Sequence, residues 1–122
     1  MSARGERTFS ADGRDINILF TNRALATAER RIGKSIVSIA QGMTSGELGI
    51  GDLATLLHVG MEAARVDQRS RSRSYSMDDA YQVLDDAGFA EVAGPVVEAI
   101  AAVISYAPES SDQTEDDLDP ND

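Results

Sequence analysis

The chain has 122 residues, of which 42% are hydrophobic and 26% charged, so its size and composition predict one ordinary globular domain and exclude two. It contains no cysteine, which excludes a disulfide framework, a thiolate metal site and a cysteine nucleophile. With three Phe, three Tyr and no Trp, any core must be mainly aliphatic.

Charge is divided unevenly along the chain, whose formal net charge is −10. All 11 basic residues lie between Arg4 and Arg73, where eight acidic residues leave a net charge of +3, and the other 13 acidic residues follow Ser74. This distribution argues against nucleic-acid binding by the C-terminal half. The N-terminus lacks the apolar stretch of a secretory signal, and the apolar residues 92–106 are too few and too interrupted to cross a bilayer, so we expect a cytoplasmic protein without a membrane partner.

A short β-hairpin is predicted near the N-terminus, with arms at residues 7–9 and 15–20. The dipeptide Asp12-Gly13 between them favours the positive φ angles of a tight turn. Apolar side chains alternate along the second arm, and Leu19 breaks this alternation; the alternating residues are Ile16, Ile18 and Phe20. Because an isolated hairpin is marginally stable in water, this apolar face must pack against something.

Two helices are predicted next. Thr21 can cap the first, because its hydroxyl can accept a hydrogen bond from the first turn, and Gly33 can end it in a left-handed conformation. The second is predicted over residues 35–41, with Gly42 as its stop. Residues 42–51 are rich in Gly, Ser and Thr, which indicates a loop.

The C-terminal half predicts three further helices. The most regular begins at Asp52, repeats apolar residues on one face, and fades into the arginine- and serine-rich residues 68–76. Ser76 can cap the next helix, which Gly88 ends. Because an interior proline removes a hydrogen bond and costs about 3 kcal/mol, the last helix is predicted to begin at Gly94 or Pro95.

The predicted fold class is therefore mainly α: a short N-terminal β-hairpin, about four to five packed helices, and a disordered acidic C-terminal tail. We expect residues 1–6 to be disordered, residues 7–106 to form the domain and residues 107–122 to form the tail. Leu118 is the one hydrophobic residue after Pro108, too little to offset the entropy cost of ordering. Dense negative charge there suits a role in solubility.

No catalytic or metal-binding constellation stands out. His58 has Glu62, four residues on, as the one nearby candidate partner, which favours a satisfied or surface histidine over a ligand or base. The glycines of residues 46–51 lack the Gly-Lys-Ser/Thr ending of a phosphate-binding loop, and the arginines of residues 69–74 have no interleaved aromatic residues. We interpret both segments as connectors and expect no enzyme activity and no cofactor.

Three parts of the chain resemble the small tail assembly chaperones of siphophages and gene transfer agents. The first is a β element, the second is a helix carrying a Glu shortly before an Ile-Gly pair, and the third is the regular helix that follows. The matching stretches are Arg4-Gly5-Glu6 with Asp12-Gly13-Arg14, then Leu25–Glu29 with Ile32–Ile36, then Leu53–Met61.

The resemblance implies a non-enzymatic protein that binds the long, helical tape measure protein and keeps it soluble while the tail tube polymerises, in the host cytoplasm if a phage encodes it. It also implies that the chain can form a homo-oligomer, and contact with the major tail protein is a further expectation. Recognition of a helix in a groove suits an aliphatic surface that contains methionine. The residues we expect to bind the partner are Leu53, Leu57, Met61, Met77, Tyr81 and Leu84. The alternative is that each of them belongs to the core.

Two other functions stay open from the sequence. One is a small structural or adaptor protein of a phage particle, which would be present stoichiometrically in finished particles. The other is a nucleic-acid-associated regulatory module, which would depend on Arg69, Arg71 and Arg73.

Overall fold

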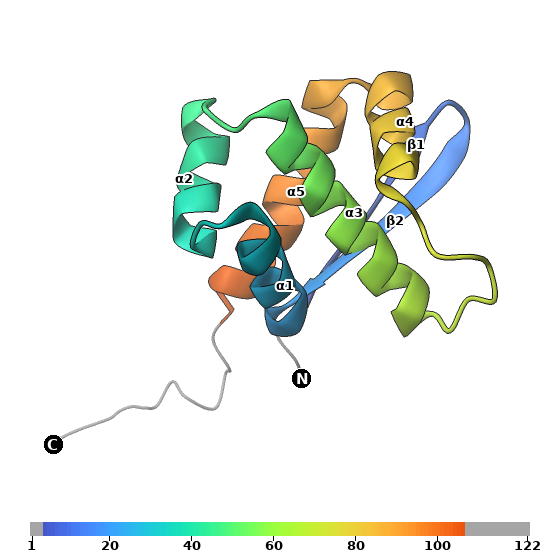
Figure 1. The fold of residues 1–122 in the computed structure, drawn as a ribbon, viewed down its shortest axis with the longest axis horizontal. Helices are drawn as coiled ribbons and strands as arrows, with labels where there is room; N and C mark the ends of the chain where they lie inside the picture. Colours follow the sequence, from blue (N-terminus) through green and yellow to red (C-terminus); the bar gives the residue numbers. More distant parts are fainter. Residues whose placement is uncertain (1–3, 107–122) are drawn as a thin grey trace, which may run out of the picture.

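The structure, a computed structural model, describes residues 4–106 as a two-stranded hairpin followed by five helices (Figure 1). This confirms the predicted fold class. The predicted tail, residues 107–122, lies outside the described residues, as do residues 1–3 of the predicted disordered N-terminus.

The hairpin consists of β1 (Arg4–Ala11) and β2 (Arg14–Thr21), which pair antiparallel with Ala11 opposite Arg14. Asp12 and Gly13 form the whole loop, and their φ angles of 51° and 77° are those of a type I′ turn. The turn therefore matches its prediction. The expectation of disorder is wrong for residues 4–6, which belong to β1 because they pack and pair with distant parts of the domain.

The helices are α1 (Asn22–Ile32), α2 (Ile36–Ser45), α3 (Ile50–Asp67), α4 (Met77–Ala87) and α5 (Phe89–Ile104). The caps predicted at Thr21, Gly33 and Ser76 are confirmed. The Thr21 hydroxyl accepts a hydrogen bond from the Ala24 N–H at 3.1 Å, and Gly33 ends α1 with φ of 83°. Ser76 and Asp79 form a reciprocal capping box at the start of α4.

Both predicted boundaries of the loop at residues 42–51 are wrong. Helix α2 continues through Gly42 to Ser45, and α3 begins at Ile50, so the loop is shorter than residues 42–51. An interior glycine costs a helix only about 1 kcal/mol. Here continuation brings Met43 against the core, and the Gly42 carbonyl accepts the backbone N–H groups of Glu47 and Leu48 at the helix end.

The predicted start of the last helix is also wrong, because α5 begins at Phe89 and contains Pro95 in its interior. A proline at this position leaves one carbonyl, that of Glu91, without its helical partner, and Glu91 is an exposed residue that water can reach. The turn before the proline is anchored by Val92, which is fully buried. Burial of this side chain offsets part of the cost of the proline.

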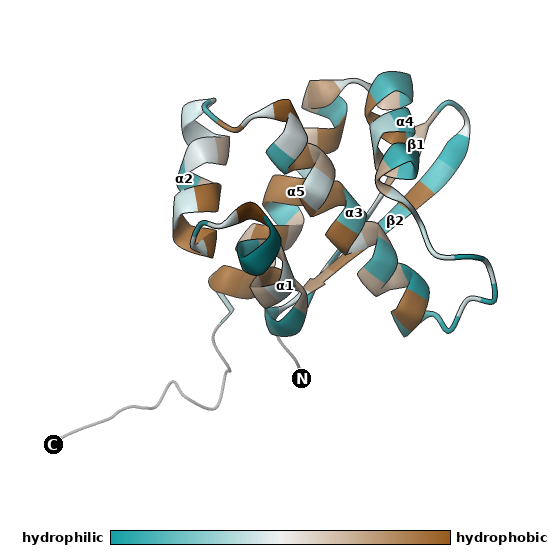
Figure 2. Cartoon of the chain, viewed as in Figure 1, coloured by the Kyte–Doolittle hydropathy of each residue, from teal (hydrophilic) through white to brown (hydrophobic). Residues whose placement is uncertain are grey.

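The core lies between one face of the hairpin and helices α3 and α5, with α1, α2 and α4 packed around them. Ile18 and Phe20 on β2 are 1% and 0% exposed. Figure 2 shows hydrophobic residues in the middle of α5 and hydrophilic residues at the tip of the hairpin. The alternating face of β2 therefore packs as the sequence requires.

Two glycines allow the backbones of the hairpin and these helices to approach closely. A Cβ atom at Gly5 on β1 would lie 1.8 Å from the carbonyl oxygen of Ala99 on α5. A Cβ at Gly60 on α3 would lie 3.0 Å from the ring of Phe20 and 3.1 Å from Cβ of Ile18. The obstacle at Gly5 is backbone, which cannot rotate aside, so position 5 requires glycine.

We expect the substitution Gly5→Ala to lower the free energy of unfolding by about 3 kcal/mol or more, because overpacking against a rigid neighbour forces the strand and helix apart. Urea denaturation followed by circular dichroism measures this. The control is Gly42→Ala, where the nearest atom would be 3.8 Å from the new Cβ. This change should leave stability unchanged or raise it by up to about 1 kcal/mol, and equal losses in the two variants would contradict the prediction.

Candidate partner-binding groove

Four of the six residues that the sequence assigns to partner binding lie inside the domain. Leu53 and Leu57 on α3 are fully buried, and Met61 and Leu84 are 3% and 7% exposed. These four side chains therefore belong to the core, which is the alternative given above.

The other two residues lie nearer the surface. Met77, at the start of α4, is partly buried, and its sulfur lies 3.2 Å from a guanidinium nitrogen of Arg31. Tyr81 is 41% exposed. Its hydroxyl group lies close to Gly51, at the first turn of α3. The six residues therefore do not form one continuous surface.

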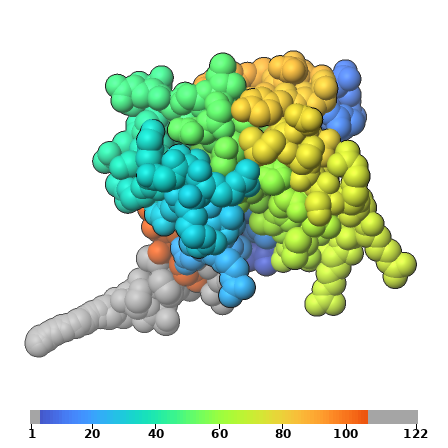
Figure 3. Space-filling view, in the orientation of Figure 1, coloured from blue at the N-terminus to red at the C-terminus, as the bar shows by residue number. Residues whose placement is uncertain are grey.

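An open groove of about 400 Å³ lies between α1 and the C-terminal half of α3, with the end of β2 at its base. In the space-filling view of Figure 3, α1 and α3 both form part of the face turned toward the reader. The apolar residues of the groove are Leu19, Ala24, Val59, Ala63 and Val66. Val66 is 63% exposed, so part of this apolar surface is open to solvent.

Two irregularities in the sequence could have identified this groove. Val59, Ala63 and Val66 follow helical spacing and form a second apolar stripe on α3, beside the one that predicts the helix. Leu19 breaks the alternation of β2 because it points to the opposite face from Ile18 and Phe20, and there it lines the groove. It is 4% exposed, so its departure from the pattern is accounted for by burial.

Both carboxylates that line the groove are already engaged by arginines. Glu62 accepts two hydrogen bonds of 2.9 Å from Arg65, which hold the pKa of Glu62 below its usual value. Asp67 accepts a hydrogen bond of 2.8 Å from Arg4 on β1, which lowers the pKa of Asp67 in the same way. Both acids are therefore ionised at neutral pH and have an internal counter-charge.

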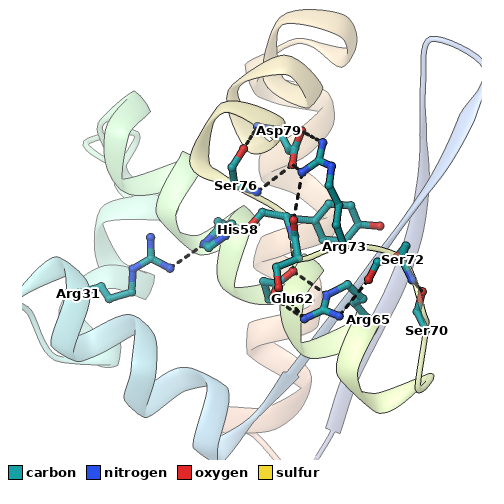
Figure 4. A network of polar contacts seen from close by, with 11 residues as sticks. Arg31, His58, Glu62, Arg65, Ser70, Ser72, Arg73, Ser76 and Asp79 are labelled. Carbon is teal, nitrogen blue, oxygen red and sulfur yellow. Dashed lines mark hydrogen bonds and ion pairs between the residues drawn. The ribbon is translucent and has the colours of Figure 1, made fainter.

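The two arginines that line the groove, Arg23 and Arg31 on α1, have no carboxylate partner among residues 4–106. Arg31 instead contacts Nδ1 of His58 at 2.8 Å. Nε2 of His58 lies 2.7 Å from the carbonyl oxygen of Tyr75. A guanidinium can only donate and a carbonyl can only accept, so the neutral histidine with its proton on Nε2 satisfies both contacts. His58 is thus a satisfied histidine that positions Arg31 (Figure 4).

The serine- and arginine-rich segment, residues 68–76, is tied to the helices on either side of it, as Figure 4 shows. Arg65 donates to the Ser74 hydroxyl at 3.1 Å, and Glu62 accepts from the backbone N–H of Tyr75 at 2.6 Å. Arg73 donates to both carboxylate oxygens of Asp79, at 3.0 and 3.2 Å. These contacts support the interpretation of the segment as a connector between α3 and α4.

Within residues 4–106, no group of three or more His, Asp or Glu side chains is placed to hold a metal ion. No single helix in this range is long and apolar enough to span a membrane; α4 and α5 meet the length and composition criteria only as a pair, which is bent by 115°.

No family model, curated protein or solved structure matches this chain.

Asp79 provides a pH-dependent test of the connector. Hydrogen bonds from Arg73 and from the backbone of Ser76 lower the pKa of Asp79 from 3.8 to about 2. Its ionised form therefore stabilises the fold fully above the unfolded value of 3.8, and this stabilisation is lost as the pH falls through about 2. We expect Asp79→Asn to cost about 1 kcal/mol at pH 7, as other cap substitutions do, and the difference from the wild type to shrink between pH 4 and pH 2.

Urea denaturation at each pH measures the difference. Asp78→Asn is the matched control, because Asp78 lies in the same helical turn but makes no hydrogen bond to Arg73 or Ser76. A loss in the Asp78 variant as large as in the Asp79 variant, or a loss that persists at pH 2, would contradict the assignment.

Proposed function

We propose that this chain is a tail assembly chaperone that binds an amphipathic helical segment of a tape measure protein in the groove between α1 and α3. The observation that carries the proposal is the groove, an open space of about 400 Å³ with an apolar base and the exposed Val66 at its edge. Amphipathic helices are recognised by such grooves, which receive apolar anchors spaced along one face of the helix.

The second support for the proposal is the family resemblance itself, whose motif residues have structural roles in the fold. Asp12-Gly13 forms the hairpin turn, Gly5 allows β1 to approach α5, and Gly60 allows α3 to approach β2. The Glu29 carboxylate accepts a hydrogen bond of 2.7 Å from the backbone N–H of Ile36, joining the end of α1 to the start of α2. None of these residues lines the groove, so they bear on the fold that holds the groove and not on the site itself.

The mode of action follows from the hydrophobic effect. A long helical protein with apolar stripes aggregates through those stripes when its partners are not yet assembled. Burying one Val or Leu side chain in a groove is worth about 1.5–3 kcal/mol, and the entropy cost of association offsets part of this gain, so a few anchors favour reversible over permanent binding. Reversibility suits a protein that must release its client as the tail tube forms.

The alternative of a nucleic-acid-binding module has a small basis in the described residues. Arg73 of the connector is paired with Asp79, and Arg65 with Glu62. Arg69 and Arg71 are the arginines of the connector without a carboxylate partner in the described range. Two exposed arginines make a weak phosphate-binding surface.

Co-expression with the tape measure protein of the same genome tests the proposal. We expect a tape measure protein that is insoluble alone to become soluble and to co-purify with this chain. An insoluble tape measure protein with no co-purification would refute the chaperone function. Stoichiometric amounts of this chain in purified particles, measured by mass spectrometry, would favour the structural or adaptor alternative.

A matched pair of surface substitutions tests the location of the site. Val66→Ser removes an exposed apolar side chain from the groove, and we expect roughly tenfold weaker binding of the tape measure protein from the lost burial. Val37→Ser changes a valine of similar exposure, 56%, on α2 and outside the groove. Binding is measured by titration calorimetry with a soluble peptide from an amphipathic helix of the tape measure protein, and the site is elsewhere if the Val37 variant is the weaker binder.

A further inference from the structure

The groove carries an unbalanced charge. Its two carboxylates, Glu62 and Asp67, are engaged by arginines that do not line the groove, whereas its own arginines, Arg23 and Arg31, have no carboxylate partner in the described range. To a ligand entering the groove, the acidic side is therefore largely neutralised and the basic side is not. We propose that the groove selects an amphipathic helix whose apolar stripe is flanked by carboxylates. The inference rests on the proposed function for the location of the site, and it adds the chemistry of the partner.

The spacing of the arginines defines the pattern that the partner must carry. Arg23 and Arg31 lie eight residues apart on α1, which places them about two helical turns, roughly 12 Å, apart along the same wall. A partner helix lying along α1 would meet them with acidic residues seven or eight positions apart. The apolar residues between these acids would face the base of the groove.

Neighbouring side chains hold Arg31 in position to contact a carboxylate of the partner. One of its terminal nitrogens contacts His58 and the other contacts the sulfur of Met77, and neither neighbour cancels its charge. A guanidinium has five N–H donors, so several remain for a carboxylate. Because the side chain is already ordered, binding costs less conformational entropy than it would for a free arginine.

Covering these arginines with a partner that offers no acceptor is unfavourable. An apolar or basic helix would remove Arg23 and Arg31 from water without replacing their hydrogen bonds, which is costly for charged groups. A carboxylate would replace the lost hydration with charge-assisted hydrogen bonds. The same two residues thus favour acidic partners and disfavour basic ones.

The test uses two synthetic helical peptides of 18 residues, the length of α3. Both carry the same leucine and alanine stripe, and the residues beside the stripe are glutamate in one peptide and lysine in the other. We expect the full chain to bind the acidic peptide at least about tenfold more tightly at 0.15 M salt, where screening suppresses the repulsion between distant charges. Fluorescence anisotropy of labelled peptides measures both affinities.

A charge-matched pair of variants shows whether the preference arises in the groove. Arg23→Gln is expected to reduce the preference for the acidic peptide by about fivefold, and within residues 4–106 its side chain makes no hydrogen bond or ion pair whose loss would disturb the fold. Arg30→Gln removes the same charge from the same helix at a residue that does not line the groove, and it should leave the preference nearly unchanged. Equal effects of the two variants would overturn the inference.

Two other results would also overturn it. Equal affinity for the two peptides, or tighter binding of the basic one, would show that the groove does not select carboxylates when it is found both for the full chain and for a chain with a less acidic C-terminal segment, while co-expression with the tape measure protein still tests the chaperone function separately. A third variant is the full chain with Glu115→Gln, Asp116→Asn, Asp117→Asn and Asp119→Asn. An acidic preference in that chain supports the inference, because most of the negative charge near the C-terminus is then removed, and its absence there as well as in the unmodified chain overturns it.

Discussion

Direct contact between the hairpin and two helices, made where Gly5 meets Ala99 and Gly60 meets Phe20, is the constraint that positions the other elements. Because α3 presents Gly60 to β2, its buried side faces the hairpin, and a second apolar stripe that includes Val59 is left for α1 to approach. The groove between α1 and α3 is thus a consequence of how closely α3 can lie on the sheet. A larger side chain at either glycine would move its walls as well as weaken the core.

The features that were predicted well from the sequence are those decided by a few neighbouring residues. Asp12-Gly13 specifies its turn through backbone sterics. Thr21 and Ser76 specify helix starts because each side chain accepts a hydrogen bond from the backbone N–H three residues further along the chain. The boundaries that were missed depend on distant packing. Helix α2 passes Gly42 because Met43 reaches the core, and α5 begins before Pro95 because Val92 is buried. Local rules state the cost of such residues correctly, but they do not include the burial that compensates for it.

The candidate site was only partly accessible to the same reasoning. A regular apolar face on a helix indicates that something covers it, and for Leu53 and Leu57 that cover is the domain's own core. Which arginines are free is a matter of tertiary structure, since the partner of Asp67 is Arg4, 63 positions away. The net charge of the basic region says nothing of this pairing. Only the fold shows which charged side chains are paired and which are not, and the expected chemistry of the partner depends on this distinction.

The ion pair between Arg7 on β1 and Glu98 on α5, 91 positions apart, has a consequence for synthesis. The strands leave the ribosome before the helices, and α5, which covers β1, is the last of the described elements to leave. Until then α3 can cover β2, but β1 lacks the helix against which Gly5 packs, and a two-stranded hairpin alone is marginal in water. The domain therefore closes late in translation, and a nascent chain stopped before α5 would lack the buried side chains of Val96 and Ile100 and present an incomplete core to the quality-control machinery of the cell.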